Sequence, residues 1–90
     1  MKPINWNAHK NQALMSERGV SFEDVVFALQ SDALLDDVVH PKGDRYPGQR
    51  MFVVRIDDYA WLVPYVEDDA EIFLKTIIPS RKASKAYLRR

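Results

Sequence analysis

Apolar residues recur at helical spacing through the first part of the chain. Asn7 is placed to cap a helix over residues 8–18, and Gly19 follows where a left-handed residue commonly ends a helix. A second helix over residues 22–30 begins directly behind Ser21, a favourable N-cap. The pattern therefore predicts two helices joined by a very short turn.

After residue 33 the pattern predicts four strands. Residues 34–39 could form a short first strand, and residues 50–57 and 59–66 alternate as the two strands of a hairpin. Residues 71–78 are an apolar run rich in β-branched residues, which is typical of a buried strand. Asp57-Asp58 predicts the turn of a hairpin, and Pro79 ends the last run because it has no N–H for a ladder. Ser80 then caps a short helix from residue 81 to about residue 88. The expected fold class is α+β, with two N-terminal helices, a three- to four-stranded antiparallel sheet and a short C-terminal helix.

Alternation within residues 50–57 separates the two faces of the predicted sheet. Phe52, Val54 and Ile56 share one face, and Met51, Val53 and Arg55 share the other. The helices would cover one face of the sheet, and the other would stay partly open. Pro64 predicts an edge strand or a bulge, because proline cannot donate to a ladder.

An aromatic face in the same hairpin has two interpretations. Its members alternate along one run: Tyr59, Trp61, Val63 and Tyr65. The favoured interpretation is the core face beneath the helices, and the alternative is a groove for a helix of a partner protein.

Composition bounds the class of protein. The 90 residues, 47% of them hydrophobic, predict one domain over residues 1–90 with a small core. The absence of cysteine excludes disulfides and thiolate metal sites, and it fits a cytoplasmic location. We expect no membrane partner, because there is no apolar leader and no run of the roughly 18–20 apolar residues that span a bilayer.

The net charge of zero hides a strong asymmetry. All 13 acidic residues lie at or before Glu71, together with seven of the 13 basic residues, so residues 1–71 carry −6 and residues 72–90 carry +6. The six basic residues of the last segment are Lys75, Arg81, Lys82, Lys85, Arg89 and Arg90. Such polarity indicates an anionic partner, either nucleic acid or an acidic protein.

Motifs for nucleotide or metal chemistry are absent. Three glycines leave no phosphate-binding loop, and His9 and His40 lack metal-ligand spacing, so surface or capping histidines are favoured. The pairs Asp36-Asp37 and Asp68-Asp69 are interpreted as solvated turn charges, because adjacent strand residues point to opposite faces. We therefore expect neither a metal nor another cofactor.

The remaining candidates are cationic, phenolic, amide and hydroxyl side chains: Arg45, Tyr46, Gln49, Arg50, Tyr65, Lys75, Thr76, Ser80, Arg81, Lys82 and Tyr87. Such groups suit metal-free cleavage of RNA, in which the 2′-hydroxyl attacks the adjacent phosphate. A base removes the proton, a guanidinium stabilises the phosphorane, and an acid protonates the leaving oxygen. An equally weighted alternative makes Arg81, Lys82 and Lys85 an ordinary solvated helix face. Lys75 is either a sheet residue with an exposed amine or a phosphate contact beside Arg81.

Three blocks of the chain, in order, carry a family resemblance. The first is Trp6, Lys10 and the sequence G-V-S-F-E-D at residues 19–24; the second is the hairpin region after a polar loop with Arg45 and Arg50. The third is I-I-P-S-R-K-A-S at residues 77–84. Together they resemble the BrnT-type toxins of bacterial type II toxin–antitoxin systems, which are relatives of the RelE/ParE superfamily.

The resemblance implies a RelE-like fold and a metal-independent endoribonuclease that inhibits translation. It implies a cognate antitoxin protein and RNA as partners; a heterotetramer with the antitoxin is one possible assembly. The resemblance maps catalysis onto Arg81 and Lys82, with Arg50 as their companion from the start of the hairpin. The candidate RNA-binding residues beside them are Arg45, Lys75, Ser80 and Lys85.

The chain also departs from the family pattern. Thr76 stands before the two isoleucines, where the family usually has arginine. The alternative function is therefore a catalytically weak or inactive toxin-like module that binds a protein partner or nucleic acid.

Overall fold

The computed structural model describes residues 2–42, 45 and 48–88; Tyr46, Arg89 and Arg90 lie outside this part of the chain. The elements run in the order β1 (Ile4–Asn5), α1 (Ala8–Arg18), α2 (Phe22–Leu29), β2 (Leu34–Val39), β3 (Gln49–Ile56), β4 (Tyr59–Glu67), β5 (Ile72–Leu74), β6 (Ile78–Pro79) and α3 (Arg81–Tyr87). The α+β class and the three expected helices are confirmed.

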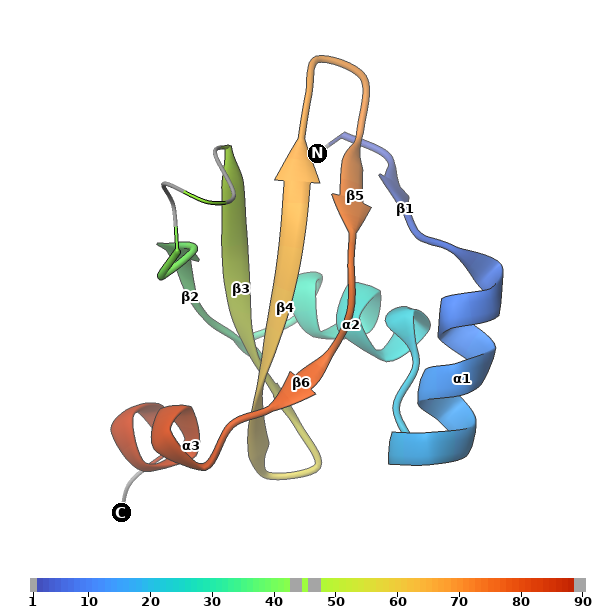
Figure 1. Cartoon of the computed structure of the whole chain (residues 1–90). Helices are drawn as coiled ribbons and strands as arrows, with labels where there is room; N and C mark the ends of the chain where they lie inside the picture. The colour runs from blue at the N-terminus through green and yellow to red at the C-terminus, as the bar shows by residue number, and fades with distance from the viewer. Residues whose placement is uncertain (1, 43–44, 46–47, 89–90) are drawn as a thin grey trace.

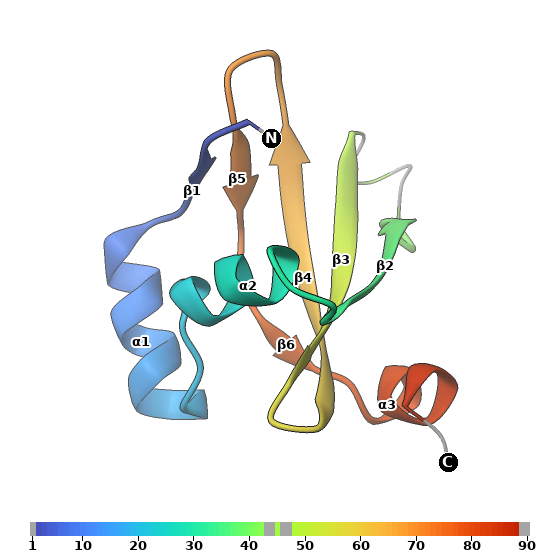
Figure 2. The same ribbon diagram turned by 180° about the vertical axis from the view of Figure 1, so that it is seen from behind.

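The strands form one mixed sheet in the order β1-β5-β4-β3-β2, with β6 also paired to β4 (Figure 1). Strands β2, β3, β4 and β5 are antiparallel neighbours, whereas β1 pairs in parallel with β5 through Ile4 and Ile72. Figure 2 shows α1 and α2 on one side of the sheet, while α3 lies beside the end that carries the β3–β4 turn.

Local signals fix the two N-terminal helices where the sequence predicts them. The Asn7 side chain accepts from the Lys10 N–H, and Gly19 ends α1 with a φ of 69°. Ser21 and Asp24 form a reciprocal capping box at the start of α2. The buried Asn11 joins the helices, because its Oδ1 accepts from the Phe22 N–H at 2.7 Å and its Nδ2 donates to Glu23 at 2.8 Å.

The two faces of the sheet carry separate apolar clusters, as alternation predicts. On the α1–α2 side, the sheet residues Phe52, Val54, Val63, Tyr65, Ile72 and Leu74 pack with helix residues that include Leu14, Phe22 and Val25. On the α3 side, Val53, Ala60 and Ala83 are buried, with Leu35, Leu62 and Leu88 packed around them. Val63 and Tyr65 thus belong to the core face, and the partly buried Trp61 packs against the same cluster.

The β3–β4 turn is the predicted Asp57-Asp58 pair. Ile56 pairs with Tyr59, so the loop has two residues, and their φ angles of 53° and 63° are both positive. This is the pattern of a type I′ turn, whose twist matches that of the strands.

Pro64 lies in a central strand rather than at an edge, and the expected irregularity occurs beside it. Tyr65 pairs with Leu74 whereas Leu62 pairs with Ile78, so the pairing shifts by one residue between β5 and β6. The Pro64 carbonyl accepts from the Lys75 N–H at 2.8 Å. Proline has no N–H, so Pro64 cannot donate a second hydrogen bond to the neighbouring strand. The hydrogen-bond ladder along β4 is therefore interrupted at Pro64, and the last strand is divided into β5 and β6.

Two details of the expected fold are therefore wrong. The sheet is mixed and larger than three or four antiparallel strands, because Ile4–Asn5 adds a parallel strand at the β5 edge. The single run expected over residues 71–78 is two strands, with a break that the pairing with β4 imposes.

Candidate functional site

Helix α3 is fixed to the sheet at one point on β4. Ser84 Oγ accepts from the Ala60 N–H at 2.8 Å and donates to the Ser80 carbonyl at 2.9 Å. The Ser80 N–H in turn donates to the Ala60 carbonyl at 3.0 Å. Ser80 is also the predicted N-cap, since its hydroxyl accepts from the Ala83 N–H. This network gives α3 a defined orientation despite its short length.

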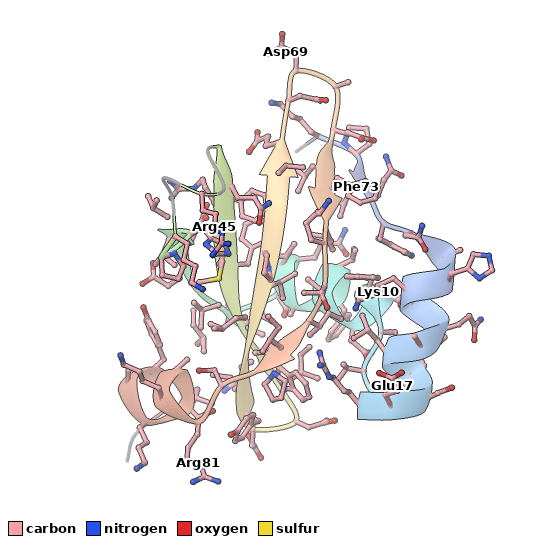
Figure 3. The ribbon with its side chains drawn as sticks, viewed as in Figure 1. Lys10, Glu17, Arg45, Asp69, Phe73 and Arg81 are labelled. Atoms are coloured by element: carbon pink, nitrogen blue, oxygen red, sulfur yellow. The ribbon has the colours of Figure 1, made fainter. Side chains whose placement is uncertain are left out.

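The cations of α3 face solvent. Arg81, Lys82 and Lys85 are all exposed, while Ala83 between them is buried against the sheet. Arg81 and Lys85 are four residues apart and so share one side of the helix. Figure 3 shows Arg81 at the opposite end of the molecule from Asp69, which lies in the acidic β4–β5 connection. The cations of α3 and the acidic β4–β5 connection thus lie at opposite ends of the molecule, while Asp57 and Asp58 of the β3–β4 turn lie at the α3 end (Figures 2 and 3).

An open groove of about 380 Å³ lies between α3 and the neighbouring face of the sheet. Val38, Met51 and Leu62 belong to its sheet side, and Lys82, Ala86 and Tyr87 belong to its helix side. The lining residues within the described part of the chain include one cation and no carboxylate, and one of them, Tyr87, is hydrogen-bonded to the carboxylate of Asp36. The groove is consequently apolar at its floor and positively charged at its rim.

Tyr87 is held in place at this groove by the edge strand. Its hydroxyl donates to Asp36 Oδ2 at 2.5 Å. This hydrogen bond raises the pKa of Tyr87 and lowers the pKa of Asp36. The phenol therefore keeps its proton at neutral pH.

Arg50 occupies a different place, in a cluster with Asp37 and Tyr65. Asp37 Oδ1 accepts from Arg50 Nε at 3.2 Å and from the Tyr65 hydroxyl at 2.7 Å. Burial, with a further contribution from the hydrogen bond to Asp37, raises the pKa of Tyr65 to about 12. Tyr65 is thus also a poor base at neutral pH.

The structure does not bring Arg50 to Arg81 and Lys82. Arg50 pairs with Tyr65 on the α1–α2 side of the sheet, whereas α3 is attached at Ala60 on the other side. The positions of Tyr65 and Ala60 along β4 are roughly 16 Å apart at the usual rise of a strand. Arg50 and α3 cannot act on one phosphate in this arrangement.

Two of the predicted RNA-binding residues, Lys75 and Arg45, also lie away from α3. The Lys75 ammonium lies over the Phe73 ring, 5.6 Å from its centroid, and Figure 3 shows Phe73 on β5, far from Arg81. Figure 3 also shows Arg45 beside β3 rather than at α3. Of the seven predicted site residues, the structure therefore gathers Ser80, Arg81, Lys82 and Lys85.

Sequence reasoning missed the partners of the two aspartates in β2. Asp36 and Asp37 are strand residues hydrogen-bonded to tyrosines, not turn charges. Their opposite directions follow from strand alternation, but their partners depend on the pairing register, for which the sequence holds no local signal.

Two further searches covered the described part of the chain. It contains no group of three or more His, Asp or Glu side chains arranged to hold a metal ion. None of its helices combines the length and the hydrophobicity of a transmembrane helix.

Comparison with known proteins adds no relative. No protein-family model, curated protein or solved structure matches the chain. The fold and site by themselves define an α+β protein with a cationic C-terminal helix docked beside an apolar groove.

Proposed function

We propose that this chain is the toxin component of a type II toxin–antitoxin system and that it acts on RNA as a metal-independent endoribonuclease. The observation that carries the proposal is the surface of α3, where Arg81, Lys82 and Lys85 are exposed and no acidic residue follows Glu71. The sequence blocks that resemble BrnT-type toxins supply the reaction class and the antitoxin partner.

In this proposal Arg81 has the central role. Its planar guanidinium matches two phosphate oxygens and would stabilise the negative charge that develops during attack of the 2′-hydroxyl. Lys82 and Lys85 would bind neighbouring phosphates of the same strand. The Ser80–Ser84 network would keep these cations in a fixed position on the sheet.

A second function, RNA binding without cleavage, is favoured by specific observations. Tyr87 is the phenol nearest these cations along the chain, and its raised pKa makes it a poor general base. Arg50, which the resemblance assigns to catalysis, is paired with Asp37 on the face of the sheet opposite to α3. The general base and the second guanidinium that cleavage at α3 would use are therefore not supplied by Tyr87 and Arg50.

Controlled expression in bacteria tests the proposal. We expect growth arrest and cleaved RNA from the native chain, and neither from Arg81→Ala at an equal level of folded protein. Lys10→Ala on α1 is a matched control that removes an exposed cation elsewhere and should remain toxic. Equal toxicity of Arg81→Ala would contradict the assigned site. Normal growth with strongly salt-dependent RNA binding would support the second function.

A further inference from the structure

The groove beside α3 has the chemical character of a site for a flat apolar ring attached to an anion. Its sheet side is formed by Val38, Met51 and Leu62, and Lys82 lies at its rim. Its volume of about 380 Å³ is at the lower end of the range for small-ligand pockets. We propose that the groove takes one unpaired nucleobase of an RNA strand whose phosphates bind along α3; this rests on the function proposed above.

The distribution of charge selects a nucleotide as the occupant. Among the described residues that line the groove the charged one is Lys82, and Arg81 and Lys85 extend the positive surface along the same helix, while the Asp36 carboxylate is engaged by the Tyr87 hydroxyl. A nucleotide combines an apolar ring face with a phosphate, which matches an apolar floor beside a cationic rim. Phosphate contacts alone would not use the floor, so the base provides the additional contact.

Tyr87 gives the groove an aromatic wall with a fixed position. Its side chain is 41% exposed, yet its hydroxyl is bonded to Asp36 on the edge strand. A ring that is already oriented loses little conformational freedom when a base packs against it. Base–aromatic packing of this kind tolerates different sequences, since every base has an apolar face.

The groove admits single-stranded RNA and excludes a duplex. A base can enter the groove only after it leaves its stack and its pairing partner. We therefore expect the base to contribute to binding in an unpaired strand and to contribute nothing in a duplex.

The test compares two RNA oligomers of the same length and charge by fluorescence anisotropy. One is an unstructured single strand, and the other carries abasic sites in place of its bases. We expect the native chain to bind the strand with bases at least about five-fold more tightly than the abasic strand. This ratio corresponds to the lower end of the free energy that stacking of one base contributes. Ala86→Phe, at an exposed position of α3, fills the groove and should bring this ratio to about one.

Two further variants complete the design. Met15→Phe adds the same ring at an exposed position of α1, on the other side of the sheet, and should keep the native ratio. Val38→Phe fills the groove from the sheet side and gives an independent test if Ala86→Phe perturbs α3.

The outcomes separate this inference from the proposed function. Salt-dependent binding with equal affinity for both oligomers in the native chain would retain RNA binding and overturn the nucleobase site. An unchanged ratio in both groove variants would also overturn it. Failure to bind either oligomer would overturn the proposed function, and the nucleobase site with it. Loss of protein-partner binding in Ala86→Phe, with the RNA ratio unchanged, would assign the groove to a protein.

Discussion

The Tyr65 hydroxyl reaches from the central strand β4 to Asp37 on the edge strand β2, where it donates a 2.7 Å hydrogen bond to the carboxylate. The Tyr65 ring stacks on Phe52 of the intervening strand, with centroids 4.0 Å apart. Arg50 Nη2 donates to the Asp37 carbonyl, and the Asp37 N–H donates to the Asp36 carboxylate. Both the N–H and the carbonyl of Asp37 are thus hydrogen-bonded to side chains. They are not free to pair with another strand at the β2 edge of the sheet.

The raised pKa of Tyr65 predicts a loss of stability at high pH. The folded-state pKa of about 12 exceeds the usual tyrosine value of about 10, so the contribution is complete below pH 10 and is lost as the pH rises to 12. Solvent around the exposed Asp37 and Arg50 side chains screens part of this effect, so we expect a loss of about 1 kcal/mol of unfolding free energy. Denaturant unfolding between pH 9 and 12 should show the native chain losing stability relative to Tyr65→Phe. Parallel pH profiles for the two proteins would contradict the prediction.

Removing the Ser84 hydroxyl should loosen α3. Ser84→Ala leaves the Ala60 N–H without its partner inside the structure, and an unsatisfied buried donor costs about 1–3 kcal/mol. We expect a lower free energy of unfolding and faster hydrogen exchange at Ala60. Ser16→Ala, at an exposed position of α1, is the matched control and should change neither quantity. Native protection of the Ala60 amide in Ser84→Ala would show that the hydroxyl does not hold the helix.

Elements with local signals could be predicted from the sequence. The bounds of α1 coincide with expectation because Asn7 and Gly19 delimit the helix. Those of β2 coincide because the second helix ends before the strand and the loop with Pro41 begins after it. Strand β1 could not be predicted, since two residues show no period and Ile4 becomes a strand residue only by pairing with Ile72. The break before Ile78 likewise arises from pairing with β4.

The residues of the candidate site likewise fall into a group that a local sequence signal brings together and a group whose position depends on strand pairing. Ser80, Arg81, Lys82 and Lys85 follow one another in the sequence, so forming one capped helix is enough to gather them. Arg50 is equally basic, but strand alternation and register place it on the other face, beside Tyr65. Residues gathered by a helix were therefore predictable, and residues gathered by the sheet were not.

Asn11 is the polar residue whose loss should affect the core most. Its carboxamide bonds both the Phe22 N–H and the Glu23 carboxylate, while its own side chain is buried. Asn11→Ala should lower the unfolding free energy by about 2 kcal/mol, because the Phe22 donor then lacks a partner. Urea unfolding measures this, with Gln12→Ala at the exposed neighbouring position as control. Equal stabilities of the two variants would show that the α1–α2 bond contributes nothing.

The β3–β4 turn offers a stabilising change. Asp57 and Asp58 both have positive φ, a conformation that Asn-Gly adopts more readily in a type I′ turn. The double variant Asp57→Asn, Asp58→Gly should raise the unfolding free energy by about 0.5–1 kcal/mol. Thermal unfolding measures the gain, and Asp58→Ala should have the opposite effect. A lower midpoint for the Asn-Gly variant would contradict this account of the turn.

The salt dependence of RNA binding distinguishes α3 from the Arg50 cluster. Each lost phosphate contact lowers the slope of log affinity against log salt by about 0.7 for a single strand. Arg81→Gln, Lys82→Gln and Lys85→Gln should each weaken binding and lower the slope by this amount. Arg50→Gln should keep the slope, because its guanidinium is paired with Asp37 on the opposite face. Lys10→Gln, on α1, is the control for loss of an exposed charge. An equal loss of slope in Arg50→Gln would place the RNA across β2 and β3, and the site on α3 would then be wrong.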